Sequence, residues 1–345
     1  MHCPQSEAGP NNRQQGAALI VAMLVFALCA AIAVAMSREF TLFSQRAGNL
    51  FHREQGYAYL RGAEELATLV LALDYEQDQS RDTPRDDLTE DWARDPEPFP
   101  LDEGGWWYGS LEDLQGRFNL NRLIGMPAQD RQKATGAERF TADQAQFIRL
   151  LQALEDADVS EQAAINIVES IADWLDPDSA VSPNGAEDDY YFSQTPAYRV
   201  ANRPMSSASE LRAVANMTPE IFAQLSPWVT VWPQTPEPLN IHTAGLPVLR
   251  SINSDDDLSP LSEAEAETLW QQRDESGFEN LEGFLANPVF EGKKIGKIAP
   301  LLGESSNYFR MSARVEIAGR ELQLYSVLRR AERRIESIVR ASGSL

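Results

Sequence analysis

Residues 13–16 read RQQG and residues 17–37 read AALIVAMLVFALCAAIAVAMS, so a polar leader runs directly into an apolar segment. The apolar segment contains no Asp, Glu, Lys, Arg or His. At about 1.5 Å per residue, a helix over residues 17–37 is about 30 Å long, which is enough to cross a bilayer core. The small residues stand in front of the apolar run, whereas a cleaved secretory signal peptide carries them behind it. We therefore expect a transmembrane helix that processing retains.

The helical pattern continues beyond the membrane span. Residues 38–75 contain no proline, and their apolar residues recur at helical spacing. We expect one unbroken helix over residues 17–75, about 90 Å long, with its first third in lipid and its last third packed on a soluble domain. Arg13 in the leader gives a weak positive-inside signal for a cytoplasmic N-terminus.

This N-terminal pattern resembles that of the type IV pilin and pseudopilin family. The resemblance implies that a prepilin peptidase cuts between Gly16 and Ala17, and that the Ala17 amine becomes a methylated mature N-terminus. Members of the family usually carry Glu at the fifth mature position, where it pairs with the N-terminal amine of the neighbouring subunit. This chain has Val21 at that position. A subunit without the acid suits a place with no neighbour ahead of it, which is the filament tip.

Composition limits the partners of the soluble part. The chain has 345 residues, of which 43% are apolar, enough for one large or two modest domains after the span. Its formal charge of −22 and its pI near 4.5 oppose nucleic acid and anionic lipid as partners, because a polyanion would repel it. Divalent cations suit it better. Cys3 lies in the leader and Cys29 in the span, so the cleaved soluble region would hold no disulfide.

Two distant parts of the chain are predicted to form one sheet. Residues 76–105 are acidic and then proline-rich, which is typical of an extended surface connection. Residues 106–113 and 116–121 alternate aromatic or apolar positions with polar ones, as two short strands joined by a turn. Residues 308–317 and 321–330 alternate likewise and predict a hairpin. We expect one antiparallel sheet interrupted by an insertion; the alternative is two unrelated small sheets.

The insertion, residues 126–305, has the pattern of a bundle of short helices. Predicted helices cover residues 141–154, 160–174 with Ser160 as its cap, 209–214, 218–225, 243–251 and 262–274. Two parts of it resemble helical hairpins of the sterile-alpha-motif or helix-hairpin-helix kind, some of which bind DNA phosphates. Here the flanking residues are acidic, at positions 255–257, 263, 265 and 267, so nucleic acid is not an expected partner.

An acidic stretch lies inside the insertion. Its six carboxylates are Asp173, Asp176, Asp178, Glu187, Asp188 and Asp189. Two carboxylates about 4 Å apart repel by about 1 kcal/mol in water and by several times more when partly buried, so a fixed cluster needs a cation. Oxygen ligands at variable spacing favour Ca²⁺ over Mg²⁺, and zinc is not expected because His242 stands alone. The alternatives are a solvated acidic loop without an ion and a hydrolase with Asp176 and Asp188 as paired acids.

The chain as a whole resembles the protein K family of type II secretion minor pseudopilins. The likeness covers nearly all of residues 13–332 and rests on the pilin-like start without an acid at Val21, on the helical insertion and on sequence motifs. The motifs are DWLDPD from residue 173, NGAEDDYY from residue 184, YRVANRP from residue 198 and LNIHTA from residue 239. The resemblance implies an α+β fold: a pilin-like long N-terminal helix and a small antiparallel sheet, with a large all-α domain inserted between strands.

These observations divide the chain into six segments. They are a prepilin leader at 1–16, the long helix at 17–75, the first part of the pilin domain at 76–125, the inserted all-α domain at 126–305, the closing hairpin of the pilin domain at 306–332 and a C-terminal tail at 333–345.

The resemblance also implies a structural function without catalysis. The subunit would cap the pseudopilus tip and start its assembly with I-type and J-type minor pseudopilins, with an H-type subunit as a further candidate. It would serve protein export across the outer membrane, where the secretin and exoproteins are candidate contacts. Its place would be the inner membrane, with a single pass and the C-terminal domain in the periplasm. The alternative is a signal-anchored periplasmic calcium-binding protein or hydrolase with an acidic site.

Members of the family hold two calcium ions in the helical domain. By that resemblance Asp176, Asp178, Glu187 and Asp188 are the expected ligands, and Asp173 and Asp189 are further candidates. The ligands of a second ion stay unassigned.

Overall fold

The computed structural model describes residues 12–81, 84–94, 96–102, 104–125 and 136–343, with residues 12–15 and Ser276 described by their backbone alone. Most of the predicted leader and the start of the predicted insertion, residues 126–135, lie outside the described residues. The chain forms two compact units that divide between Tyr59 and Leu60, and each is described by itself.

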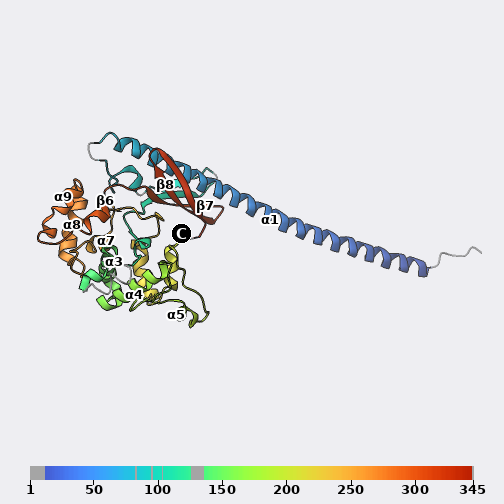
Figure 1. The fold of residues 1–345 in the computed structure, drawn as a ribbon. Coiled ribbons are helices and arrows are strands. Elements are labelled where there is room, and N and C mark those ends of the chain that lie inside the picture. Colours follow the sequence, from blue (N-terminus) through green and yellow to red (C-terminus); the bar gives the residue numbers. More distant parts are fainter. Residues whose placement is uncertain (1–11, 82–83, 95, 103, 126–135, 344–345) are drawn as a thin grey trace, which may run out of the picture. The chain divides into compact units, whose positions relative to one another are not determined.

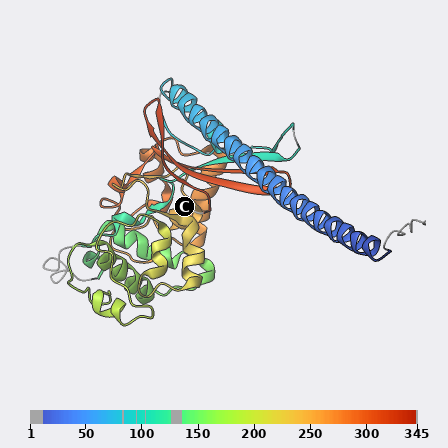
Figure 2. The ribbon, with the colours of Figure 1, turned by 90° about the vertical axis from the view of Figure 1, so that its right-hand side faces the viewer.

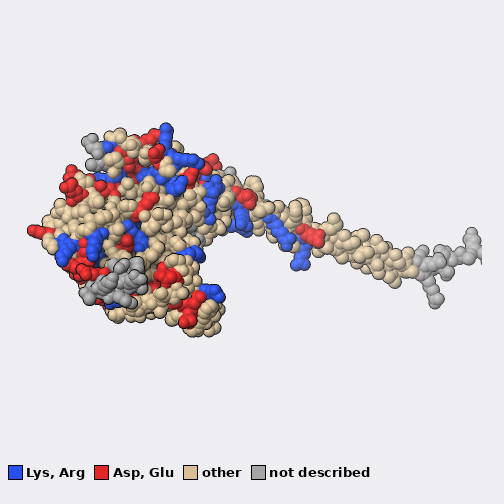
Figure 3. Space-filling model, in the orientation of Figure 1, with Lys and Arg blue, Asp and Glu red and all other residues tan. Residues whose placement is uncertain are grey.

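The first unit contains the N-terminal part of helix α1, which spans Asn12–Asp78. The prediction of one unbroken helix over residues 17–75 is confirmed, and the helix extends a few residues further at each end. The large apolar side chains between Leu19 and Phe43 are exposed. In Figure 3 the part of α1 next to the grey residues has an uncharged surface. Within the described part of the chain, α1 is long and apolar enough to cross a membrane.

The second unit contains a five-stranded antiparallel sheet in the order β1-β2-β7-β8-β9. Figure 1 labels its strands β7 and β8, which lie side by side. Its strands are β1 Phe99–Pro100, β2 Trp106–Asp113, β7 Tyr308–Ile317, β8 Arg320–Ala331 and β9 Arg334–Ala341. β2 pairs along its whole length with β7, from Trp106 opposite Glu316 to Asp113 opposite Phe309. The prediction of one sheet built from both sides of a long insertion is therefore confirmed.

The last part of α1 packs on this sheet (Figure 2). β7 turns every second side chain inward, burying Phe309, Met311, Ala313, Val315 and Ile317. α1 buries residues at helical spacing, namely Leu60, Ala63, Ala67 and Leu71. On the same face of α1, the buried Glu64 accepts hydrogen bonds from Ser326 of β8 and Arg340 of β9. Burial opposes ionisation of Glu64, but these partners outweigh it and lower its pKa.

Residues 116–121 do not add a second strand to this sheet, and that prediction is wrong. β3, Phe118–Asn119, instead pairs in parallel with β4, Val229–Thr230, in a separate two-stranded sheet. Phe118 is buried in the core of the helical domain, and the Asn119 side chain accepts a hydrogen bond from Asn121 N and so begins a 3-10 helix. These two side chains direct the chain away from the main sheet.

Residues 333–345 do not form a tail, because β9 occupies Arg334–Ala341 within them. β9 pairs with β8, which would otherwise present an unpaired edge. The sequence prediction ended the sheet one strand too early, since the partner that anchors β9, Glu64, lies far away on α1.

Residues 76–105 were predicted to be an extended surface connection, and that prediction is wrong for part of the segment, which is buried. Asp86 is 0% exposed, Trp92 is 3% exposed and Glu90 is 5% exposed. A short 3-10 helix forms at Asp91–Ala93. The segment is buried because its carboxylates bind arginine side chains in place of water.

The inserted domain is mainly helical, as predicted. Within its described residues, 136–305, the α-helices are α3 Ala142–Gln152, α4 Glu161–Leu175, α5 Asp188–Phe192, α6 Pro219–Leu225, α7 Leu246–Arg250, α8 Glu263–Ser276 and α9 Leu281–Leu285. The 3-10 helices of the second unit, besides the one noted above, are Leu120–Arg122, Gly136–Arg139, Glu155–Ala157, Ala208–Ala213, Ser226–Trp228, Pro288–Phe290 and Ala299–Leu301. β5 Leu239–Asn240 pairs in parallel with β6 Leu302–Gly303. The region predicted as a helix at 209–214 is thus a 3-10 helix.

A buried polar junction ties the helical domain to the sheet. Asp113, at the end of β2, accepts hydrogen bonds through Oδ2 from Thr243, Ser306 and Asn240. Burial raises the pKa of Asp113 to about 6 in spite of these donors. The junction fixes where the insertion leaves the sheet and where it returns.

Candidate metal centre

Helix α4 positions the acidic loop, residues 176–187, which follows directly after it. Ser160 accepts a hydrogen bond from Ala163 N and begins the helix as predicted, and Asp176 ends it with an extended backbone. Near the end of α4, Trp174 packs edge-to-face on Tyr191 of α5, with ring centroids 5.2 Å apart. Both ends of the acidic loop are therefore held by buried aromatic packing.

Two acids of α4 close the loop from inside. Asp173 is fully buried, and its carboxylate accepts hydrogen bonds from Ser182 Oγ at 2.5 Å and Ser182 N at 2.9 Å. Glu169 Oε2 accepts hydrogen bonds from Asn184 N at 2.7 Å and Asn184 Nδ2 at 2.8 Å. A Cβ on Gly185 would lie 1.9 Å from Asp173 Oδ2, so glycine is the residue that lets the loop pass this close to α4.

The folded loop brings three carboxylates together. One oxygen each from Asp176, Asp178 and Glu187 lies within 4.8 Å of the other two. Asp176 is half-buried, Asp178 is exposed and Glu187 is buried. This arrangement presents a half-open cluster of oxygen atoms, which is the kind of donor set that Ca²⁺ takes.

The other three predicted ligands lie outside this close group. Asp173 binds Ser182, as described above. Asp188 is half-buried and accepts a hydrogen bond from Val200 N at 3.2 Å. Asp189 is exposed in the first turn of α5. Of the six predicted ligands the fold thus brings Asp176, Asp178 and Glu187 together, and the assignment of all six as calcium ligands stays a prediction.

Glu187 is the residue whose surroundings most favour a cation. It is only 7% exposed, and neither of its carboxylate oxygens has a hydrogen-bond partner among the described residues. Its pKa is raised to about 7, first by burial and then by the charges of Asp173, Asp176, Asp178 and Asp188. A divalent cation among the three close carboxylates would offset both effects, so the residues present fit the predicted ion.

Glu169 escaped the sequence prediction, although a signal was present. It lies four residues before Asp173, on the same face of α4, and both bind the acidic loop. The four-residue spacing between Glu169 and Asp173 was therefore enough to predict that both side chains lie on the same face of α4.

A second group of acids, in the pilin domain, was also missed. One oxygen each from Asp74, Asp78, Asp86 and Glu90 lies within 4.8 Å of the others, and all four residues are buried. We call these four residues the acid cluster. Because Arg330 binds both Asp74 and Asp86, a guanidinium already lies against this cluster and we assign no metal ion to it. The cluster was missed because residues 76–105 were predicted to be an exposed connection, in which acidic side chains are solvated.

Comparison with known proteins identifies the family. Two family models described as Type II secretion system (T2SS), protein K match residues 116–234 and 239–304, more than half of the chain. The type II secretion system protein K of Pseudomonas aeruginosa is 32% identical over 92% of this chain and 90% of its own length. The chain belongs to the type II secretion system protein K family. Within this family, the protein K of Aeromonas hydrophila is 37% identical over 67% of each chain.

A solved structure supports the same fold for the protein K family. A chain in the crystal structure of the GspK-GspI-GspJ complex from enterotoxigenic Escherichia coli matches with a TM-score of 0.72 and 27% sequence identity. The match covers 87% of this chain and 100% of that chain. The expected fold, a long N-terminal helix with an antiparallel sheet and an inserted helical domain, is therefore confirmed, and the chain is a minor pseudopilin of type II secretion.

Proposed function

We propose that this subunit caps the tip of the pseudopilus and starts its assembly, without catalysing a reaction. The observation that carries the proposal is Val21, an apolar residue at the position where pilin-like subunits pair an acid with the N-terminal amine of a neighbour. A subunit that cannot form this pair suits the one place in a filament with no neighbour ahead of it.

The inserted domain supports a terminal position. It leaves the sheet after β2 and returns at β7, and these two strands are neighbours in the sheet (Figure 2). A subunit stacked on the same side would have to accommodate this whole domain. Growth of the filament would then proceed only from the other side.

The proposed partners are I-type and J-type minor pseudopilins. The support is the matching chain in the GspK-GspI-GspJ complex, whose full length is covered by this chain. An H-type subunit, the secretin and exoproteins are further candidates. The proposed location is the inner membrane, with α1 as a single pass and the second unit in the periplasm.

Processing between Gly16 and Ala17 is part of the proposal. Both residues lie inside helix α1, where glycine costs about 1 kcal/mol relative to alanine. A Cβ on Gly16 would meet nothing within 4 Å, so packing within this chain does not require glycine there. Recognition of this position by a peptidase that requires glycine would explain why glycine is present there.

Calcium at the acidic loop is the second part of the proposal. Asp176, Asp178 and Glu187 would hold the ion, which would supply the loop closure that a protein without a periplasmic disulfide lacks. Asp188 stays a further expected ligand of this ion, with Asp173 and Asp189 as less secure candidates. The family resemblance adds a second ion, whose ligands stay unassigned. The ion would act as a structural link.

The test is the mass of the mature N-terminus after expression with and without prepilin peptidase. We expect a start at Ala17 only when the peptidase is present, together with co-purification of I-type and J-type subunits. Gly16→Ala, which leaves the helix intact, is expected to block cleavage.

The alternative, a signal-anchored periplasmic protein, predicts the opposite pattern. An N-terminus that does not depend on the peptidase, or a processed protein that never co-purifies with other minor pseudopilins, would contradict the proposal. Loss of cleavage in the Gly16→Ala variant with retained co-purification would separate processing from assembly.

A further inference from the structure

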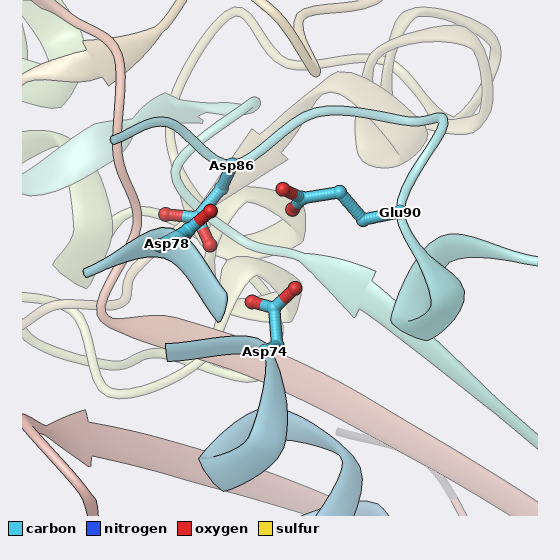
Figure 4. A group of neighbouring side chains, drawn as sticks. All are labelled: Asp74, Asp78, Asp86 and Glu90. Carbon is cyan, nitrogen blue, oxygen red and sulfur yellow. The ribbon is translucent and has the colours of Figure 1, made fainter. Parts of the chain in front are cut away.

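The acid cluster joins the end of α1 to the connection that follows it. Figure 4 shows Asp74 and Asp78 on the last turns of α1 facing Asp86 and Glu90 on the connection. Each of the four is at most 6% exposed. The cluster therefore lies inside the second unit, away from water that could screen its charges.

Two arginines face the cluster. Arg330 of β8 donates hydrogen bonds to Asp74 Oδ2 at 2.9 Å and to both oxygens of Asp86, at 2.5 and 2.6 Å. Arg81, in the turn after α1, donates to Glu90 Oε1 at 2.5 Å and lies 2.9 Å from Asp78 Oδ1. Four carboxylates meet two guanidinium groups, so full ionisation leaves two negative charges uncompensated.

Among the residues that the structure describes, the other charged groups nearby do not supply the missing positive charge. Asp87 is paired with Arg85 at 2.9 Å. Asp113 of β2 reaches Asp86 through Ser306, whose Oγ donates to Asp113 and whose N donates to Asp86. Asp113 adds a further acid to the surroundings.

The position of the cluster on α1 adds to the repulsion. The last turn of α1 contains no basic residue. The C-terminal end of a helix carries a partial negative charge, so an ionised carboxylate is unfavourable there. Protonation of Asp78 or Asp74 therefore stabilises both the cluster and the helix end.

The pKa values of Asp74 and Asp78 are shifted upward, which is the direction that a buried and negatively charged surrounding requires. Burial first, and then the charges of Glu90 and Asp86, raise the pKa of both Asp74 and Asp78 to about 7. Both values lie above the ordinary Asp pKa of about 3.9, so the folded state binds protons more tightly than the unfolded state. The stability linked to these protons is complete at low pH and is lost as pH rises from about 4 through about 7.

We propose that the acid cluster is a proton-dependent clasp, which holds the connection at residues 84–94 against the last turns of α1 and loosens when Asp74 and Asp78 are both ionised. The clasp would stiffen the join between the last turns of α1 and the rest of the second unit at mildly acidic pH, and it would loosen as the pH rises through neutrality. At alkaline pH the join becomes compliant while the rest of the fold persists.

The test uses the full chain in detergent micelles with EDTA, so that divalent cations do not vary. Thermal unfolding is followed from pH 5.5 to 8.5 for the wild type, Asp78→Asn and Glu76→Gln. Asn at position 78 copies the protonated side chain. The matched control, Glu76, lies on the same turn of α1 but is paired at the surface with Arg333.

We expect the wild-type melting temperature to fall with rising pH, and Asp78→Asn to lose the share of that fall that comes from its own proton. Asp74, Asp113 and Glu187, whose pKa values are also raised, keep their shares in the variant. At pH 8.5 the Asp78→Asn variant melts higher than the wild type by about 3 °C, although it has lost its charge pair with Arg81. Glu76→Gln keeps the wild-type slope. A residue with a merely structural ion pair would instead be destabilised by the same substitution.

A local measurement follows the clasp directly. Trp92 Nε1 donates to Glu90 Oε2 at 2.7 Å, so the fluorine NMR signal of fluorotryptophan at position 92 reports on the cluster. The signal is assigned with Trp92→Phe and is expected to titrate near neutral pH in the wild type and in Glu76→Gln. An unchanged titration in Asp78→Asn, or a wild-type signal that does not move above pH 6, overturns the proposal.

Discussion

At the residue scale, Glu187 concentrates the electrostatic cost of the acidic loop. Its two oxygens have no hydrogen-bond partner among the described residues, and its neighbours are acids. Asp173, by contrast, is more deeply buried but is satisfied by Ser182. The difference shows why burial alone does not make an acid a metal ligand. Whether its oxygens already accept hydrogen bonds from the protein determines whether they are available to a cation.

We expect Glu187→Gln to weaken calcium binding by at least about tenfold, since outer-shell changes alone cost metal sites 10–100-fold. Wild-type protein should melt at a higher temperature with millimolar Ca²⁺ than with EGTA, and the variant should lose most of that difference. Glu161→Gln, the same chemical change at an exposed acid in the first turn of α4, away from the acidic loop, is the matched control.

The calcium effect also has a predicted pH dependence. Protons compete with the ion for Glu187, whose pKa is raised to about 7, so the gain in melting temperature should be larger at pH 8 than at pH 6. Equal calcium responses in the wild type and Glu187→Gln, or no response in either, would remove this site from the proposal.

At the scale of elements, β9 is attached to the fold by one long-range ion pair as well as by its ladder. Arg340 binds the buried Glu64 of α1 through Nε and Nη2, at 2.8 Å in each case. Arg334 on the same strand binds Glu336, which is its neighbour on the surface. The two arginines thus offer a comparison within one strand.

We expect Arg340→Met to lower the free energy of unfolding by about 1–2 kcal/mol, because the buried Glu64 carboxylate then keeps only the more distant Arg61, at 3.4 Å, as a cation. The figure is smaller than for a fully buried pair because the Arg340 side chain is 40% exposed to screening solvent. Arg334→Met should change the free energy by less than about 0.5 kcal/mol. Urea unfolding of the full chain measures both, and equal losses would show that Arg340 acts only as a strand residue.

At the scale of the whole molecule, net charge excludes one class of partner. The chain carries a formal charge of −22, and the helical hairpins that resemble DNA-binding modules are flanked by acids such as Asp255 and Glu263. The basic Arg250 of the second hairpin is buried, where its guanidinium donates to carbonyl groups of the chain.

We therefore expect no measurable binding to duplex DNA at low salt. Fluorescence anisotropy of a labelled duplex in 50 mM salt should stay flat up to about 10 µM protein, a concentration at which nonspecific DNA-binding proteins commonly bind. A rise in anisotropy that disappears with added salt would contradict the argument from charge.

The sequence alone determined the elements whose signals are local. The period of apolar residues specified α1, and the alternation at 308–317 and 321–330 specified the hairpin, because side-chain spacing reports directly on helix or strand. The acidic loop was also found from sequence, since its carboxylates are close together along the chain.

Tertiary structure decided everything that depends on burial and on distant partners. Arg330 and Asp86 are separated by most of the chain, so no local pattern could show that one neutralises the other. The same holds for Glu64 and Arg340, whose ion pair anchors β9 where the sequence predicted a C-terminal tail. A carboxylate looks the same in any sequence; desolvation and the partners that folding places around it determine whether it is a solvated charge, a ligand or a proton-binding group.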